Sequence, residues 1–210
     1  MSILSQLSSQ VGDRTEKSNL KVAEQCLDNP ALLQDIAVGL DSKEAALTGD
    51  CAEVLTEVAK VHPDWVAPYA AALSKLLAHK ITRVRWEAMH ALALVAETVP
   101  EVIGDLLPRL QEIIRSDSSV IVRDYAVEAV GNFAGTSTLA ARAAYPVLVE
   151  AITLWDEKQA APALEGLVKV GAIEPGLAGE LWKLGIRYHD HDRARVRKAA
   201  KGLIKVSGRD

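Results

Sequence analysis

Residues that could bind a metal ion gather in one short segment near the C-terminal end of the sequence. The tetrapeptide His189-Asp190-His191-Asp192 places two imidazoles two positions apart, a spacing that allows chelation from a loop. A strong zinc site needs three or four ligands of defined geometry, and nothing near this segment completes the set. We therefore predict no metal site, and we expect Asp190 or Asp192 to cap the helix that follows.

The two cysteines are the next candidates for chemistry. A secreted disulfide scaffold would carry more than Cys26 and Cys51. Cys51 takes a position that small core residues hold elsewhere in the chain, so we expect a buried and inert thiol there. Cys26 lies near the end of a predicted helix, and no histidine or basic neighbour indicates a reactive thiolate.

Four tryptophans could anchor a partner, because tryptophan is favoured at the centres of protein interfaces. Trp65 and Trp155 lie close to predicted helix ends, where an indole ring typically fills a junction between repeats. Trp182 has the same interpretation. Trp86 follows the arginine of a repeated motif, and we expect it to be partly exposed and to be the possible anchor.

The remaining sequence excludes several classes of protein. It contains no nucleophile elbow, P-loop, dinucleotide fingerprint or His-Glu-x-x-His motif, so we predict no catalytic residues and no cofactor. The formal net charge is −4, whereas a general nucleic-acid binder is expected to be basic. Neither a signal peptide nor an apolar run long enough to span a membrane is recognisable. These features predict a cytoplasmic protein.

A repeated pattern predicts the elements that carry these residues. Segments beginning at Val84, Val122 and Val196 align without gaps as Val-Arg-x-x-Ala followed by further apolar residues. Two weaker copies complete a set of five. Their central small residues recur at spacings of 37 or 38 residues and are Cys51, Ala88, Ala126, Ala163 and Ala200. Apolar residues recur at i, i+4, i+7 and i+8, which is typical of an amphipathic helix.

A second helix is predicted after each of these first helices. The predicted second helices span 65–77, 102–114, 140–152 and about 177–188, and 31–40 is that of an incomplete first repeat. Pro63 and Pro100 suit the first turns of second helices, and Pro108 and Pro146 mark either a late helix start or a kink. We predict one domain over residues 1–210, with repeats at about 17–40, 43–78, 81–116, 118–154 and 157–188 and a capping helix at 192–206.

Two-helix units of this length, with Val-Arg-x-x-Ala in the first helix, resemble HEAT repeats over about residues 17–206. The resemblance implies an all-α, right-handed α–α superhelix of about five HEAT-like helix pairs plus the C-terminal capping helix. It also implies a ladder in which an aspartate such as Asp117 or Asp192 pairs with the motif arginines Arg85, Arg123 and Arg197. The ladder is expected to be partial, because the loop before Arg85 lacks the acid.

The basic end of the chain has a structural interpretation. Residues 191–210 hold seven basic side chains, Arg209 among them, and two acidic ones, Asp192 and Asp210. An end unit of a solenoid needs one apolar face and one polar face. We therefore expect the last helix to pack its apolar stripe inward and to expose its lysines and arginines.

Ligands of HEAT solenoids usually bind the concave face, which the second helices line. Alignment of the second helices produces three columns of residues on that face, one of which runs Pro68, Asp105, Ala143 and Glu180. The charged members, which are our candidate partner-binding residues, are Lys75, Asp105, Arg109, Glu112, Glu150, Glu180 and Arg187. A solvated face with ion pairs between repeats is the alternative interpretation, with each pair contributing under roughly 1 kcal/mol.

The sequence leaves three functions open. The first is a protein-interaction scaffold without catalytic activity, whose partner is another protein. The second is a DNA-binding protein similar to the HEAT-like alkylpurine DNA glycosylases, although acidic residues in the columns would repel phosphate. The third is a HEAT-like lyase, for which no pocket is recognisable.

Overall fold

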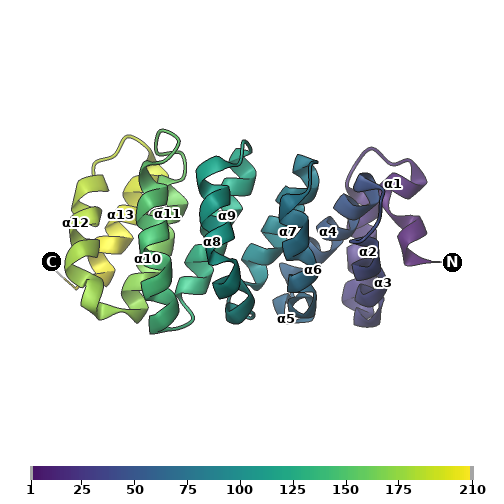
Figure 1. The fold of residues 1–210 in the computed structure, drawn as a ribbon, viewed down its shortest axis with the longest axis horizontal. Coiled ribbons are helices and arrows are strands. Elements are labelled where there is room, and N and C mark those ends of the chain that lie inside the picture. Colours follow the sequence, from purple (N-terminus) through teal and green to yellow (C-terminus); the bar gives the residue numbers. More distant parts are fainter. Residues whose placement is uncertain (1, 209–210) are drawn as a thin grey trace. The chain divides into compact units, whose positions relative to one another are not determined.

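The structure is a computed structural model that describes residues 2–208, and every regular element in this range is a helix (Figure 1). This confirms the all-α prediction. The chain divides into two compact units, with the boundary between Val99 and Pro100. The boundary lies inside the predicted repeat 81–116. The prediction of one domain over residues 1–210 stays a prediction, and each unit is described separately below.

Unit 1 extends to Val99 and is built around one long helix. Its central helix α4 packs against α2 on one side and α7 on the other. The elements of the unit are η1 (Ile3–Gln6), α1 (Ser8–Val11), α2 (Lys17–Asp28), η2 (Pro30–Leu32), α3 (Leu33–Gly39), α4 (Ala45–Ala59), α5 (Pro63–Val66), η3 (Ala67–Tyr69), α6 (Ala70–Lys75), η4 (Leu76–Ala78) and α7 (Thr82–Val95).

Unit 2 begins at Pro100 and repeats a similar plan. Helix α11 packs against α9, α10 and α13, while α8 packs against α9 and α10. The elements are α8 (Pro100–Ser116), α9 (Val120–Ala134), α10 (Thr138–Thr153), α11 (Ala160–Ile173), η5 (Pro175–Leu177), α12 (Ala178–Tyr188) and α13 (Ala194–Val206).

The predicted repeat register is confirmed by burial. All five small residues of the register lie on first helices (α4, α7, α9, α11 and α13) and are completely buried; they are Cys51, Ala88, Ala126, Ala163 and Ala200. Small residues bring neighbouring helices very close together. A Cβ atom added to Gly131 of α9 would lie 2.8 Å from the Cα of Gly166 in α11, nearer than packed carbon atoms come.

The second helix of the repeat 43–78 differs from the prediction. The expected continuous helix 65–77 is divided into the four short elements α5, η3, α6 and η4. Pro68 lies inside η3, and a proline provides no N–H for an intrahelical hydrogen bond. The prolines of unit 2 behave differently, because Pro108 and Pro146 both lie within continuous helices that begin eight residues earlier, at 100 and 138. Neither proline marks a helix start.

The motif arginines share one hydrogen bond to the loop before their own helix, and the ladder that pairs them with aspartates stays a prediction. Each arginine donates from Nη1 to a backbone carbonyl six residues earlier in the loop before its own helix. Arg85 donates to His79, Arg123 to Asp117 and Arg197 to His191. A carbonyl oxygen is present whatever the side chain at that position is. This explains why Arg85 keeps the same contact although its loop lacks an aspartate.

The last helix packs as expected of a capping helix. Val196, Ala200 and Leu203 of α13 are buried against α11 and α12, and Ile204 is half-buried. Lys198, Lys201 and Lys205 are exposed. The helix starts at Ala194 with Arg193 at the N-cap position and no side-chain cap, so the predicted capping by Asp190 or Asp192 is wrong. Arg209 and Asp210 lie outside the described residues.

Candidate functional site: an acidic-rimmed apolar groove

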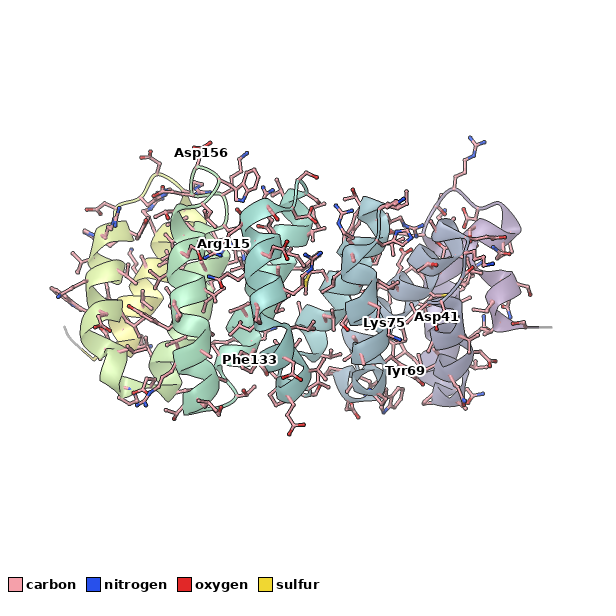
Figure 2. The ribbon with its side chains drawn as sticks, viewed as in Figure 1. Asp41, Tyr69, Lys75, Arg115, Phe133 and Asp156 are labelled. Carbon is pink, nitrogen blue, oxygen red and sulfur yellow. The ribbon has the colours of Figure 1, made fainter. Side chains whose placement is uncertain are left out.

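The predicted partner-binding residues all lie on second helices or the equivalent segment. Lys75 is exposed on α6 of unit 1 (Figure 2). The others belong to unit 2, where Asp105, Arg109 and Glu112 lie on α8, Glu150 on α10, and Glu180 and Arg187 on α12. The prediction that these residues belong to second helices is therefore correct, and the columns that group them stay a prediction. Their role in binding a partner stays a prediction.

Two of these carboxylates are occupied by ion pairs. Glu112 accepts from Arg109 one turn earlier on α8, at 2.5 Å. Glu150 of α10 binds Arg115 of α8 through two hydrogen bonds of 2.6 and 2.8 Å, and it also accepts from Gln111. Arg115 accordingly lies over α10 in Figure 2. These hydrogen bonds, Arg115 first, lower the pKa of Glu150, so this carboxylate holds α8 and α10 together.

Asp105 has different surroundings, because it lies on the edge of a groove. The groove has a volume of about 500 Å³ and lies between α8 and α10. Its lining residues are Pro100, Glu101, Gly104, Asp105, Leu107, Phe133, Thr136, Ser137, Leu139, Ala140 and Ala143. Asp105 and Ala143 belong to the same predicted column. The groove is therefore the place where one column of the sequence alignment becomes a concave surface of unit 2.

The walls of the groove are mainly apolar. Phe133, at the end of α9, is 7% exposed and places its ring 3.5 Å from the position that a Cβ atom on Gly104 would take. The absence of a side chain at Gly104 therefore keeps the ring accessible from the groove. Leu139, in the first turn of α10, is 80% exposed and is the most exposed of the large apolar side chains. An exposed leucine beside an accessible aromatic ring is typical of a surface that binds another molecule.

The rim of the groove is acidic. Glu101 and Asp105 lie one turn apart on α8, and both are exposed. No lysine, arginine or histidine is among the residues that line the groove. Neither carboxylate has a hydrogen bond or ion pair with another described side chain. The groove can therefore receive an apolar group whose neighbour carries a positive charge.

The tryptophans are arranged differently from the prediction. Trp86 is half-buried, as expected, but the most exposed tryptophan is Trp155, at 38%. Its indole Nε1 donates to the carbonyl of Ile114 at 2.9 Å, and its ring covers the Arg123 guanidinium at 3.9 Å. Trp155 was expected to fill a junction, and these contacts join α8, α9 and the loop after α10.

The segment with two histidines supports that same loop. Trp155, Asp156 and Glu157 all have positive φ angles, between 54° and 60°, which is costly for residues with side chains; Asp156 is labelled in Figure 2. The Glu157 carboxylate accepts from Tyr188 and binds His191 at 3.1 Å, and the His191 contact lowers the pKa of Glu157. Within residues 2–208, no group of three or more histidine, cysteine or acidic residues is arranged to hold a metal ion.

Both cysteines are buried and free. Burial raises the pKa of the Cys26 thiol to about 11 and that of Cys51 to about 12. Thiols with such pKa values carry almost no thiolate at neutral pH, so neither residue is activated as a nucleophile.

Sequence reasoning missed most of the groove. Glu101, Phe133 and Leu139 come from three helices, and only Asp105 and Ala143 were recognised as neighbours. Phe133 carries the one signal that was available, because it is the single phenylalanine of a chain whose core is aliphatic. An aromatic side chain at the end of a first helix, where the other repeats have none, indicates a local departure from regular packing.

Comparisons with known proteins support the fold class. No family model matches the chain, and no curated protein sequence matches it. Among solved structures, an engineered protein has a TM-score of 0.78 at 17% identity, covering 98% of this chain and 95% of that one. A designed armadillo-repeat protein in complex with the peptide (KR)4 has a TM-score of 0.75 at 17% identity, covering 98% of each chain.

A further engineered protein has a TM-score of 0.71 at 20% identity and covers 99% of each chain. Identities this low define the fold and not the activity. The class of protein is therefore an α-helical repeat solenoid. Among residues 2–208, no helix is long and apolar enough to cross a membrane.

Proposed function

We propose that this chain is a single HEAT-like adaptor domain that binds a peptide segment of another protein in the groove between α8 and α10. The segment places an apolar side chain against Phe133 and Leu139, and an adjacent lysine or arginine pairs with Glu101 or Asp105. The observation that carries the proposal is the combination of an apolar floor with a rim whose charged members are all acidic. We propose no catalytic activity and a cytoplasmic location.

The apolar walls supply the favourable free energy of this interaction. Covering an exposed leucine and part of a phenylalanine ring removes apolar surface from water, at roughly 25 cal/mol per Å². A single anchor of this kind corresponds to weak, reversible binding once the ordering of the peptide is included. An adaptor that exchanges partners needs binding of this strength.

The acidic rim determines which peptides bind. Glu101 and Asp105 lie on exposed turns of α8, where a peptide cation can approach them without desolvating a buried group. Complementary rim charges act mainly on specificity and on the association rate. The designed armadillo-repeat neighbour is in complex with the basic peptide (KR)4, which is consistent with a cationic ligand for a related fold. Phosphate groups of DNA would be repelled by the same carboxylates, so the DNA-binding hypothesis is not favoured.

Titration of labelled peptides tests the proposal. Fluorescence anisotropy is measured with an alternating Leu-Lys octapeptide, an alternating Leu-Glu octapeptide and the peptide (KR)4. We expect the Leu-Lys peptide to bind, the Leu-Glu peptide to fail, and (KR)4 to bind more weakly because it lacks an apolar anchor. The double variant Glu101→Lys with Asp105→Lys should lower the affinity for the Leu-Lys peptide at least about tenfold, because it replaces attraction with like-charge repulsion.

A matched control separates the groove from the general charge of the protein. Glu128 lies on the first helix α9, is exposed, and does not line the groove. Glu128→Lys should leave the affinity of the Leu-Lys peptide within about twofold of the unmodified chain. The groove would not be the binding site if both variants lost the same affinity for the Leu-Lys peptide. The same conclusion would follow if the Leu-Lys and Leu-Glu peptides bound equally well.

A further inference from the structure

A second cavity, in unit 1, contains a buried carboxylate without a partner. The cavity has a volume of about 460 Å³ and lies between α4 and α7, where the α1–α2 loop closes one side. Its lining residues are Ser8, Ser9, Asp13, Arg14, Thr15, Glu16, Ala46, Asp50, Glu53, Arg83, Trp86 and Glu87. Arg83, Trp86 and Glu87 share one face of α7, because residues three and four positions apart are neighbours on a helix.

Three charged residues of this cavity, Arg83, Asp50 and Glu53, are already paired with one another. Arg83 Nη2 donates to Asp50 Oδ1 at 2.7 Å and to Glu53 Oε2 at 2.6 Å. The buried Asn19 donates to the same two carboxylates, and the backbone N–H of Ser9 donates to Asp50 Oδ2 at 2.7 Å. Burial acts to raise the pKa of Asp50, but these hydrogen bonds outweigh it and hold the pKa below its ordinary value. Asp50 and Glu53 are therefore parts of a finished network.

Glu87 lies next to this network and is not part of it. Its side chain lines the cavity, yet the residue is only 6% exposed. No described residue forms a hydrogen bond or ion pair with its carboxylate. Burial, followed by the negative charge of Glu53, raises the pKa of Glu87 to about 7. A buried carboxylate without a partner is costly, and folded proteins usually provide a partner for such a group.

We propose that the cavity of unit 1 binds an alkylammonium group, with the Glu87 carboxylate as its counter-ion and the Trp86 ring as one wall. Five carboxylates and two guanidinium groups line the space, so its charge favours a cation. The indole ring of tryptophan adds a surface that attracts cations. The ligand is a lysine side chain of another protein or a free aliphatic amine, since both present the same group.

The shape of the acceptor set selects an ammonium over other cations. A guanidinium ligand needs two acceptors side by side, and Arg83 already occupies that arrangement on Asp50 and Glu53. The Glu87 carboxylate, which is buried and has no partner among the described residues, suits the compact charge of an ammonium. Metal ions are disfavoured because no group of three or more histidine, cysteine or acidic residues within 2–208 is arranged to hold one.

Isothermal titration calorimetry with defined amines tests the proposal. The probes are 1,5-diaminopentane and Nα-acetyl-lysine methylamide, with Nα,Nε-diacetyl-lysine methylamide as the neutral control. At about pH 8, where Glu87 is ionised, we expect at least one amine to bind with a dissociation constant of roughly 1 mM or below and the neutral control to fail. Binding of the diamine alone assigns a free amine as the ligand, and binding of the lysine derivative assigns a protein side chain.

Two variants identify the residue that carries the binding. Glu87→Gln should lower the affinity for the amine at least about tenfold, because it replaces a charge-assisted contact with a neutral one. Glu24 is an exposed residue of α2 in the same unit and does not line the cavity. Glu24→Gln should therefore leave the affinity for the amine unchanged. Circular dichroism verifies that both variants are folded.

The pH dependence of amine affinity provides a further test, because it would not change if Glu87 had only a structural role. The charges that act on Glu87 are Glu53 and Glu57 from α4, Lys60 directly after α4, and Arg83 from its own helix. The amine should bind more weakly at about pH 6 than at about pH 8 in the unmodified chain, and the difference should shrink in Glu87→Gln. Failure of both amines up to about 10 mM, or equal binding by Glu87→Gln, would overturn the proposal.

Discussion

The carboxylates of units 1 and 2 lie in opposite environments. In unit 1 the carboxylates of Asp50, Glu53 and Glu87 are buried between first helices, and those of Asp50 and Glu53 have partners from α1, α2 and α7. In unit 2 the carboxylates of Glu101 and Asp105 are exposed on a second helix, beside an apolar groove. Both arrangements use helices of the same repeat register.

The difference shows how a repeat can acquire a specialised site without changing its core. The small residues of the register are completely buried in both units. Charged side chains on the rest of the helix surface either form a network with neighbouring helices, as around Asp50, or are exposed to solvent, as at Glu101. A buried network requires many partners at once, whereas an exposed rim requires none.

The largest expected effect tests the claim that only a prepared network tolerates a buried carboxylate. Ala126→Asp places a carboxylate on α9 at a site that is completely buried. The new carboxylate would lack hydrogen-bond partners of the kind that surround Asp50 of α4. We expect the middle of the repeat array to unfold, with a loss of several kcal/mol in the free energy of unfolding. Urea denaturation followed by circular dichroism measures the change.

Ala172→Asp is the matched control for that substitution. Ala172 lies exposed near the end of α11, and the same change there should alter stability by less than about 1 kcal/mol. If Ala126→Asp kept the stability of the unmodified chain, the repeat register itself would be wrong.

A smaller effect concerns the pH dependence of unit 1. The pKa of Glu87 is about 7 in the folded chain against an ordinary value of 4.5. Because the folded state binds the proton more tightly, this residue's contribution is favourable below about pH 4.5 and is lost as the pH rises through about 7. The loss amounts to roughly 3 kcal/mol if the whole shift is realised.

Glu87→Gln removes this dependence. The variant should match the unmodified chain near pH 4.5 and be more stable than it at about pH 8, by up to roughly 3 kcal/mol. Urea unfolding at several pH values provides the comparison. Parallel stability curves for the two chains across this range would mean that the Glu87 carboxylate is not desolvated in the folded state.

The smallest effect compares one arginine from each unit. Arg83→Ala removes the cation shared by Asp50 and Glu53, which are buried, and should cost between about 1 and 3 kcal/mol. Arg115→Ala removes the cation of Glu150 in a pair that is partly exposed, and should cost less than Arg83→Ala does. Thermal unfolding of both variants in the same buffer measures the difference. Equal losses would remove the distinction between the two kinds of charge network.

The sequence by itself determined the helical class and the register of the repeats. Apolar residues at helical spacing and a small residue every 37 or 38 positions were sufficient, because close helix packing tolerates only small side chains at those positions. The second helices of unit 2 were also predicted correctly to within a few residues. The broken segment 63–78 was not, because apolar periodicity does not distinguish one continuous helix from a succession of short α and 3-10 turns.

Only the tertiary structure decided where chemistry gathers. Glu87 gives no local signal in the sequence. Its isolation depends on how Arg83, Asn19 and Ser9 occupy the neighbouring carboxylates. The groove likewise depends on helices from two repeats and on the accessible ring of Phe133. Periodicity specifies which face of a helix is buried, but burial, pairing and pKa are properties of several helices together. For this reason the predicted columns contained one member of the acidic rim and none of the buried cluster.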